Sequence, residues 1–71
     1  MTISASQAEK ILKGNHAFKQ FGFSMLVTRL KSLYAKDPSQ ATVQSCATEM
    51  NAFMDKFNSI MGEDFATIKT L

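Results

Sequence analysis

Apolar residues recur at helical spacing in the second half of the chain, most regularly between residues 43 and 61. Apolar positions follow one another there at steps of three and one, and the positions between them are polar except Ala52. This repeat is wider than the seam of a two-stranded coiled coil, and it predicts a helix with one broad apolar face over residues 38–61. Its apolar positions are Val43, Cys46, Ala47, Met50, Phe53, Met54, Phe57, Ile60 and Met61.

Two helices are expected before this one. A helix over residues 5–13 begins after a serine cap at Ser4 or Ser6. A second helix over residues 16–36 is predicted because apolar side chains recur at steps of three and four. The tail, residues 63–71, has apolar residues three apart, which favours a final helical turn slightly over extended chain. The apolar positions of the second helix are Phe18, Phe21, Met25, Leu26, Leu30, Leu33 and Tyr34.

Glycine, proline and short polar residues mark the predicted boundaries. Gly14 followed by Asn15 is typical of a left-handed helix end and the cap of the next helix. Asp37 before Pro38 fits a cap followed by the first helical position, where no amide donor is needed. Gly22 lies inside the second predicted helix. It either lets a neighbouring backbone approach closely or breaks the helix there.

The predicted fold is all-α. The short connection at Asp37 makes the two long helices an antiparallel hairpin, and the helix over residues 5–13 packs beside it. The result is a small bundle of three helices, with or without a short C-terminal turn. A chain of 71 residues is long enough for one domain and too short for two, so residues 1–71 are expected to form a single helical domain.

Composition narrows the class of protein. Hydrophobic residues make up 45% of the chain and charged residues 20%, as in globular domains. The chain has no apolar run long enough for a membrane span and no export signal, so a cytoplasmic location is expected. The single cysteine agrees with a reducing compartment.

The charges are divided unevenly along the chain. Residues 1–36 carry six basic residues and one acidic residue, and residues 37–71 carry two basic and five acidic residues. One interpretation is a small nucleic-acid-associated protein with a basic surface in its first half. The basic residues are scattered singly, however, which favours pairing between a basic and an acidic helix. The alternative basic surface consists of Lys10, Lys13, Lys19, Arg29 and Lys31.

No arrangement of residues indicates catalysis, a cofactor or a metal site, so a non-enzymatic protein is expected. Cys46 is the only thiol and His16 the only imidazole, and the predicted hairpin places them far apart. Cys46 also falls on the apolar stripe, where a free cysteine behaves as a small hydrophobic residue. A helix-turn-helix reader of DNA is disfavoured because the second helix is largely apolar.

The sequence predicts an interaction surface from the lengths of its elements. The helix over residues 5–13 and the tail both join the hairpin at the end far from Asp37. The apolar stripe near Asp37 is therefore expected to stay exposed and to form a homo-oligomer interface or to bind a partner helix. We thus expect a protein–protein interaction or self-associating module. The predicted interface residues are Leu30, Leu33, Tyr34, Val43, Cys46 and Met50.

Overall fold

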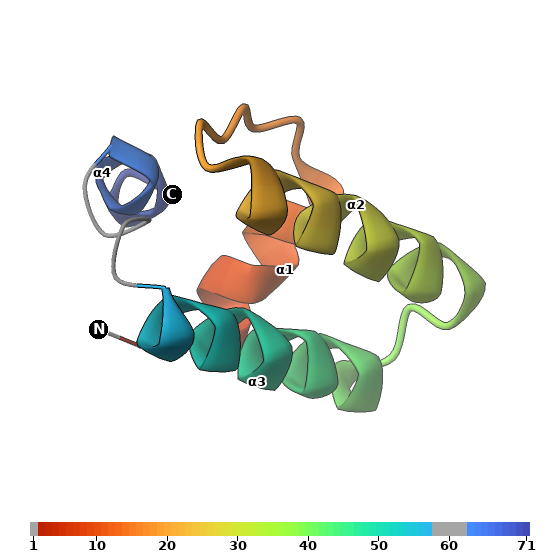
Figure 1. Cartoon of the computed structure of the whole chain (residues 1–71). Coiled ribbons are helices and arrows are strands. Elements are labelled where there is room, and N and C mark those ends of the chain that lie inside the picture. Colours follow the sequence, from red (N-terminus) through yellow and green to blue (C-terminus); the bar gives the residue numbers. More distant parts are fainter. Residues whose placement is uncertain (1, 58–62) are drawn as a thin grey trace.

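A computed structural model describes residues 2–57 and 63–71, and within these residues the chain forms four helices (Figure 1). Three of them make a small all-α bundle built on the antiparallel α2–α3 hairpin, as the sequence predicts. The short fourth helix, α4, lies in the tail, where helix was slightly favoured over extended chain. The helices are α1 (Ala5–Lys13), α2 (Phe21–Lys36), α3 (Gln40–Lys56) and α4 (Glu63–Lys69).

Helix α1 begins at a capping box. The Ser4 hydroxyl accepts a hydrogen bond from the Gln7 amide, and the Gln7 side chain accepts one from the Ser4 amide, each at 3.1 Å. Two amides at the helix start, which have no partner within the helix, are thereby satisfied. Ser4, not Ser6, is therefore the cap. The limits of α1 coincide with the predicted range.

Helix α2 begins at Phe21, five residues later than predicted, and residues 15–20 are not helical. The Gln20 side chain caps the helix by accepting a hydrogen bond from the Phe23 amide. The predicted start was wrong because Phe18 belongs to a non-helical segment and is nevertheless half-buried. Its ring packs edge-on against that of Phe23, with ring centroids 5.0 Å apart. Its apolar spacing therefore imitates a helical period. Gly22 lies in the first turn of α2 and does not break the helix.

The end of α1 also differs from its prediction. Gly14 caps the helix with φ of −89°, which is not the left-handed conformation, and Asn15 caps no helix. The Gly14 amide donates to the Lys10 carbonyl oxygen at 2.8 Å. A Cβ added to Gly14 would lie 2.8 Å from that oxygen and 2.4 Å from the His16 ring, so close approach explains the glycine.

The turn between α2 and α3 is capped by Ser39 and not by Asp37. The Ser39 hydroxyl accepts a hydrogen bond from the Thr42 amide at 3.2 Å, and Asp37 instead closes the end of α2. The Asp37 carboxylate accepts a bond from the Thr42 hydroxyl at 2.9 Å, which ties the turn to α3. Pro38 consequently precedes the helix.

Helix α3 ends at Lys56, earlier than the predicted residue 61. Phe57 caps it in a non-helical conformation. The remainder of the predicted helix, with Ile60 and Met61, lies outside the described residues.

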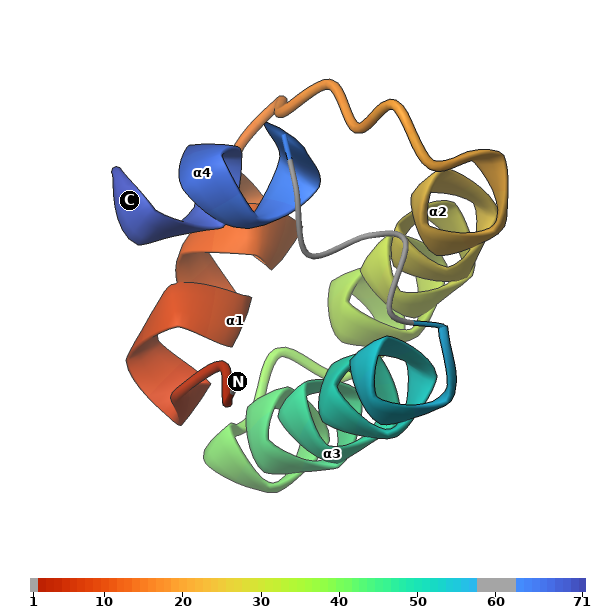
Figure 2. The same cartoon turned by 60° about the vertical axis from the view of Figure 1, so that its left-hand side comes forward.

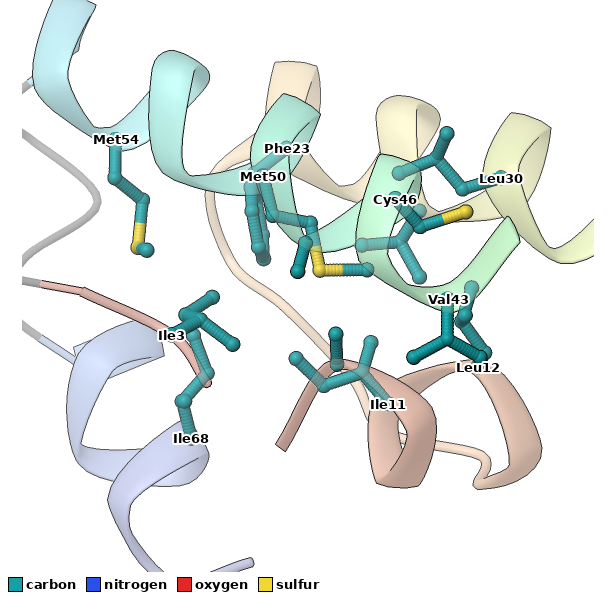
Figure 3. Packing of buried hydrophobic residues seen from close by; sticks show 13 residues of the cluster. Ile3, Ile11, Leu12, Phe23, Leu30, Val43, Cys46, Met50, Met54 and Ile68 are labelled. Atoms are coloured by element: carbon teal, nitrogen blue, oxygen red, sulfur yellow. The ribbon is translucent and has the colours of Figure 1, made fainter. Parts of the chain in front are cut away.

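The core lies between α1 and the inner side of the hairpin, and α4 covers the hairpin end far from Asp37 (Figures 1 and 2). Met50 and Met54 of α3 face α1 and Ile3, and Ile68 of α4 lies next to Ile3 (Figure 3). Asn51 fixes this end of the chain through two hydrogen bonds. Its side-chain oxygen accepts from the Ile3 amide at 2.6 Å, and its amide donates to the Ile3 carbonyl oxygen at 2.9 Å. The buried core is Ile3, Ala8, Ile11, Leu12, Phe23, Val27, Leu30, Val43, Cys46, Ala47, Met50, Met54 and Ile68.

None of the helices in the described part of the chain combines the length and the apolar character needed to cross a membrane.

Candidate interaction surface

The apolar band that was expected to stay exposed near the turn is mostly part of the core. Leu30, Val43, Cys46 and Met50 are all buried within a single copy of the chain. Those four cannot meet a partner while the chain stays folded, so the expectation that they form an exposed interface was wrong. The other two predicted residues differ: Leu33 is 43% exposed, and Tyr34 is half-buried.

The predicted interface residues are mostly buried because of the path that the chain takes between α1 and α2. The Lys31 ammonium donates to the Gly14 carbonyl oxygen at 2.7 Å, so α1 ends beside the turn-proximal half of α2. The ten residues from Phe21 to Lys31 rise about 15 Å along the helix. The seven steps from Gly14 to Phe21 reach about 23 Å when extended, which is enough to return the chain to the start of α2. A tight turn at Gly14, as predicted, would have left α1 at the far end.

Cys46 is buried beside a hollow of about 370 Å³ near the turn, which Leu33, Asp37 and Thr42 also line. Burial raises the pKa of the Cys46 thiol above its usual value; nearby Glu49 adds to this effect and Arg29 opposes it. A raised pKa keeps the thiol protonated and unreactive near neutral pH. Among the described residues, no group of three or more His, Cys, Asp or Glu is placed to hold a metal ion.

The basic residues of the first half mostly contact groups of the chain itself. Arg29 pairs with Glu49 of α3 at 2.7 Å, and this pair joins the basic helix to the acidic one. Lys13 pairs with Glu9 at 3.3 Å, and Lys10 donates to the Leu71 carbonyl oxygen at 2.6 Å. Lys31 likewise contacts the chain itself, through the Gly14 carbonyl oxygen.

Large apolar side chains are also exposed elsewhere on the hairpin. Phe21 is 76% exposed, Met25 57% and Phe57 41%. Between α2 and α3 lies an open groove of about 290 Å³, which Phe57 helps to line. The groove and the exposed side chains are called the outer hairpin face. Its residues are Phe21, Met25, Leu26, Glu49, Ala52, Phe53, Lys56 and Phe57.

A chain of aromatic contacts connects this face to the core. Phe23, which is fully buried, lies 5.7 Å from Phe53 between ring centroids, and Phe53 lies 4.6 Å from Phe57. The Lys56 ammonium lies 5.6 Å from the Phe57 ring centroid, within the range of a cation–π contact. A Cβ added to Gly22 would come 3.1 Å from the Phe53 ring. These contacts hold the Phe53 ring in place at the floor of the face.

Sequence reasoning assigned Phe21 and Met25 to the buried stripe of the second helix. The buried positions of α2 are Phe23, Val27 and Leu30. Phe21 and Met25 are four residues apart and fall on the opposite side of the helix from these. The apolar residues of α2 therefore occupy more of its circumference than one core can cover, and this was the signal that could have located the face.

Comparison of the chain with protein-family models, curated proteins and solved structures finds no match. The arrangement itself defines the class: a small all-α domain whose core is closed by its own helices. Its exposed apolar groove lies between two antiparallel helices, a shape into which a further helix can pack.

Proposed function

We propose that the chain is a non-enzymatic interaction module that binds helical protein segments, its own or another protein's, through the outer hairpin face. The observation that carries this proposal is the open groove between α2 and α3, which the exposed Phe57 helps to line, together with two further exposed apolar side chains of α2, Phe21 and Met25. Exposed apolar patches of a few hundred Å² on globular domains are frequently sites of association. A cytoplasmic location forms part of the proposal, because a lone buried thiol suits a reducing compartment.

The size of the patch determines the strength of binding that we expect. A fully exposed phenylalanine presents on the order of 150–250 Å², so the three side chains together offer roughly 300 Å². At about 25 cal/mol per Å², covering them contributes about 7 kcal/mol. Association costs about 4–15 kcal/mol in lost freedom. The apolar contacts alone therefore give weak, reversible binding, and polar contacts at the groove must add to it.

The test compares the outer hairpin face with an exposed apolar residue elsewhere. Sedimentation velocity over a range of protein concentrations measures self-association, and titration with designed amphipathic helical peptides measures binding of foreign helices. Phe21→Ser and Met25→Ser should weaken whichever association the wild type shows. Leu33→Ser is the matched control, because Leu33 is also an exposed apolar residue of α2 but lies near the turn.

Two results would overturn the proposed function. One is a wild-type protein that neither self-associates nor binds any helical peptide. The other is an association that Leu33→Ser weakens as much as Phe21→Ser does, since the outer hairpin face would then have no special part in it.

A further inference from the structure

We infer that the outer hairpin face binds a second copy of the same chain, with the two α3 helices packed antiparallel about a twofold axis between Ala52 and Phe53. The inference rests on the proposed function and names its partner. A twofold contact requires a self-complementary surface. If one residue of the first copy contacts a second residue of the other copy, the same two residues also meet with the copies exchanged.

The charges on the groove meet this requirement. Glu49 and Lys56 line the same groove, have opposite charge and are seven residues apart on α3. Seven residues are two helical turns, so both lie on one side of the helix. The proposed axis lies midway between them and brings Glu49 of each copy opposite Lys56 of the other. Two identical ion pairs form in each dimer. Arg29, already 2.7 Å from Glu49, would stand beside each pair.

The sizes of the side chains at the centre of the proposed contact also make the surface self-complementary. Ala52 is small and exposed, and Phe53 beside it is large and half-buried. The same axis places Ala52 of one copy against Phe53 of the other, twice. The Phe53 ring is held by its contacts with Phe23 and Phe57, so it presents a fixed shape to the small residue opposite. A large residue facing a small one lets two helices approach closely.

The area of the face indicates how strong the dimer is. Stable homodimers bury about 800 Å² or more per partner, whereas the three exposed apolar side chains of this face supply roughly 300 Å². The apolar area of the face is therefore well below what a stable homodimer buries. The dimer should therefore form reversibly and dissociate on dilution. Its ion pairs should determine the register of the two copies more than its affinity.

Charge reversal tests this register directly. Glu49→Lys alone sets two lysines opposite each other, and Lys56→Glu alone sets two glutamates opposite each other, twice per dimer in each case. Sedimentation at low salt should show self-association weakened roughly five- to tenfold in either variant. An equimolar mixture of the two variants restores both ion pairs in a heterodimer. The mixture should therefore associate about as well as the wild type.

Matched controls carry the same charge changes outside the groove. Asp55→Lys changes the charge of α3 by the same amount as Glu49→Lys, and Lys36→Glu is the control for Lys56→Glu. Asp55, Lys36 and Lys56 are exposed, whereas Glu49 is half-buried. Circular dichroism establishes that each variant is folded. If loss of the Arg29 pair unfolds Glu49→Lys, Ala52→Gln decides, because this neutral change at an exposed position overfills the centre of the contact and should abolish dimerisation.

The outcomes separate the two proposals. Restoration in the mixture, with both controls unaffected, supports the twofold contact. Controls that weaken association equally, or a mixture no better than its components, would overturn it. So would a dimer that Ala52→Gln leaves intact. A monomer at every concentration that still binds helical peptides refutes only the second copy and leaves the proposed function standing.

Discussion

Replacing Leu30 with alanine, beside the same change at Leu33, measures whether the core is closed within one copy. Both are leucines of α2, but Leu30 is 0% exposed and Leu33 is 43% exposed. Leu30 packs in the cluster that joins α1, α2 and α3. Leu33 borders the open hollow near the turn. The pair thus holds the helix and the chemistry constant and varies only burial.

The expected magnitudes differ severalfold. A buried leucine shortened to alanine loses its transfer free energy and leaves a cavity, for a total of about 3–4 kcal/mol. A domain of this size has only about 3–5 kcal/mol of stability, so Leu30→Ala should be close to half unfolded in water. Leu33→Ala should lose at most about 1 kcal/mol, because its side chain is already partly hydrated.

Urea denaturation followed by circular dichroism measures both losses. With a slope of about 1 kcal/mol per molar urea for a small domain, the midpoint should fall by about 3 M for Leu30→Ala and by less than about 1 M for Leu33→Ala. If Leu30→Ala has no folded baseline in water, added trimethylamine N-oxide stabilises the folded state and supplies the missing part of the denaturation curve. The measurement is made at low protein concentration, where dimers have dissociated.

Two results would refute the reasoning. Equal losses for the two leucines would mean that Leu30 is not part of a packed interior. A loss at Leu30 that disappears on dilution would mean that a second copy covers it. In that case the interface predicted from the sequence, and not the outer hairpin face, would be the site of association.

Two further predictions concern single side chains. Asn51→Ala should lower the free energy of unfolding by about 1–3 kcal/mol because both polar groups of the Ile3 backbone lose their partner; unchanged stability with a still-protected Ile3 amide in hydrogen exchange would contradict this. Burial, assisted by Glu49, raises the pKa of Cys46 in the folded state, so its contribution to stability is complete below the unfolded pKa of about 8.5 and declines as pH rises above it. The difference in unfolding free energy between wild type and Cys46→Ala should therefore shrink from about pH 8.5 upward, and a difference independent of pH would exclude the effect.

The helices with strong local signals could be predicted from sequence. Ser4 at the start of α1 satisfies backbone groups within one turn, and the buried positions from Val43 to Met54 follow a period that only a helix explains. The start of α2 could not be predicted in this way. Phe18 is half-buried through a tertiary contact, and its spacing in the sequence cannot be told from a helical period.

The error at α2 spread to the predicted site. A helix beginning at residue 16 left α1 no connecting chain with which to reach the turn, so Val43 and Met50 were expected to be exposed. The six non-helical residues before Phe21 reverse that conclusion. They also move the exposed apolar surface to Phe21 and Met25. The candidate surface thus depended on the geometry of one connection, which local propensity does not determine.

Tyr34 gives the protein a native optical reporter at an informative place. It is the only tyrosine, and the chain has no tryptophan. Its hydroxyl, on α2, donates to the Glu9 carboxylate of α1 at a long 3.3 Å. Tyrosine emission therefore monitors the docking of α1 on the hairpin without any label, from a residue outside the outer hairpin face.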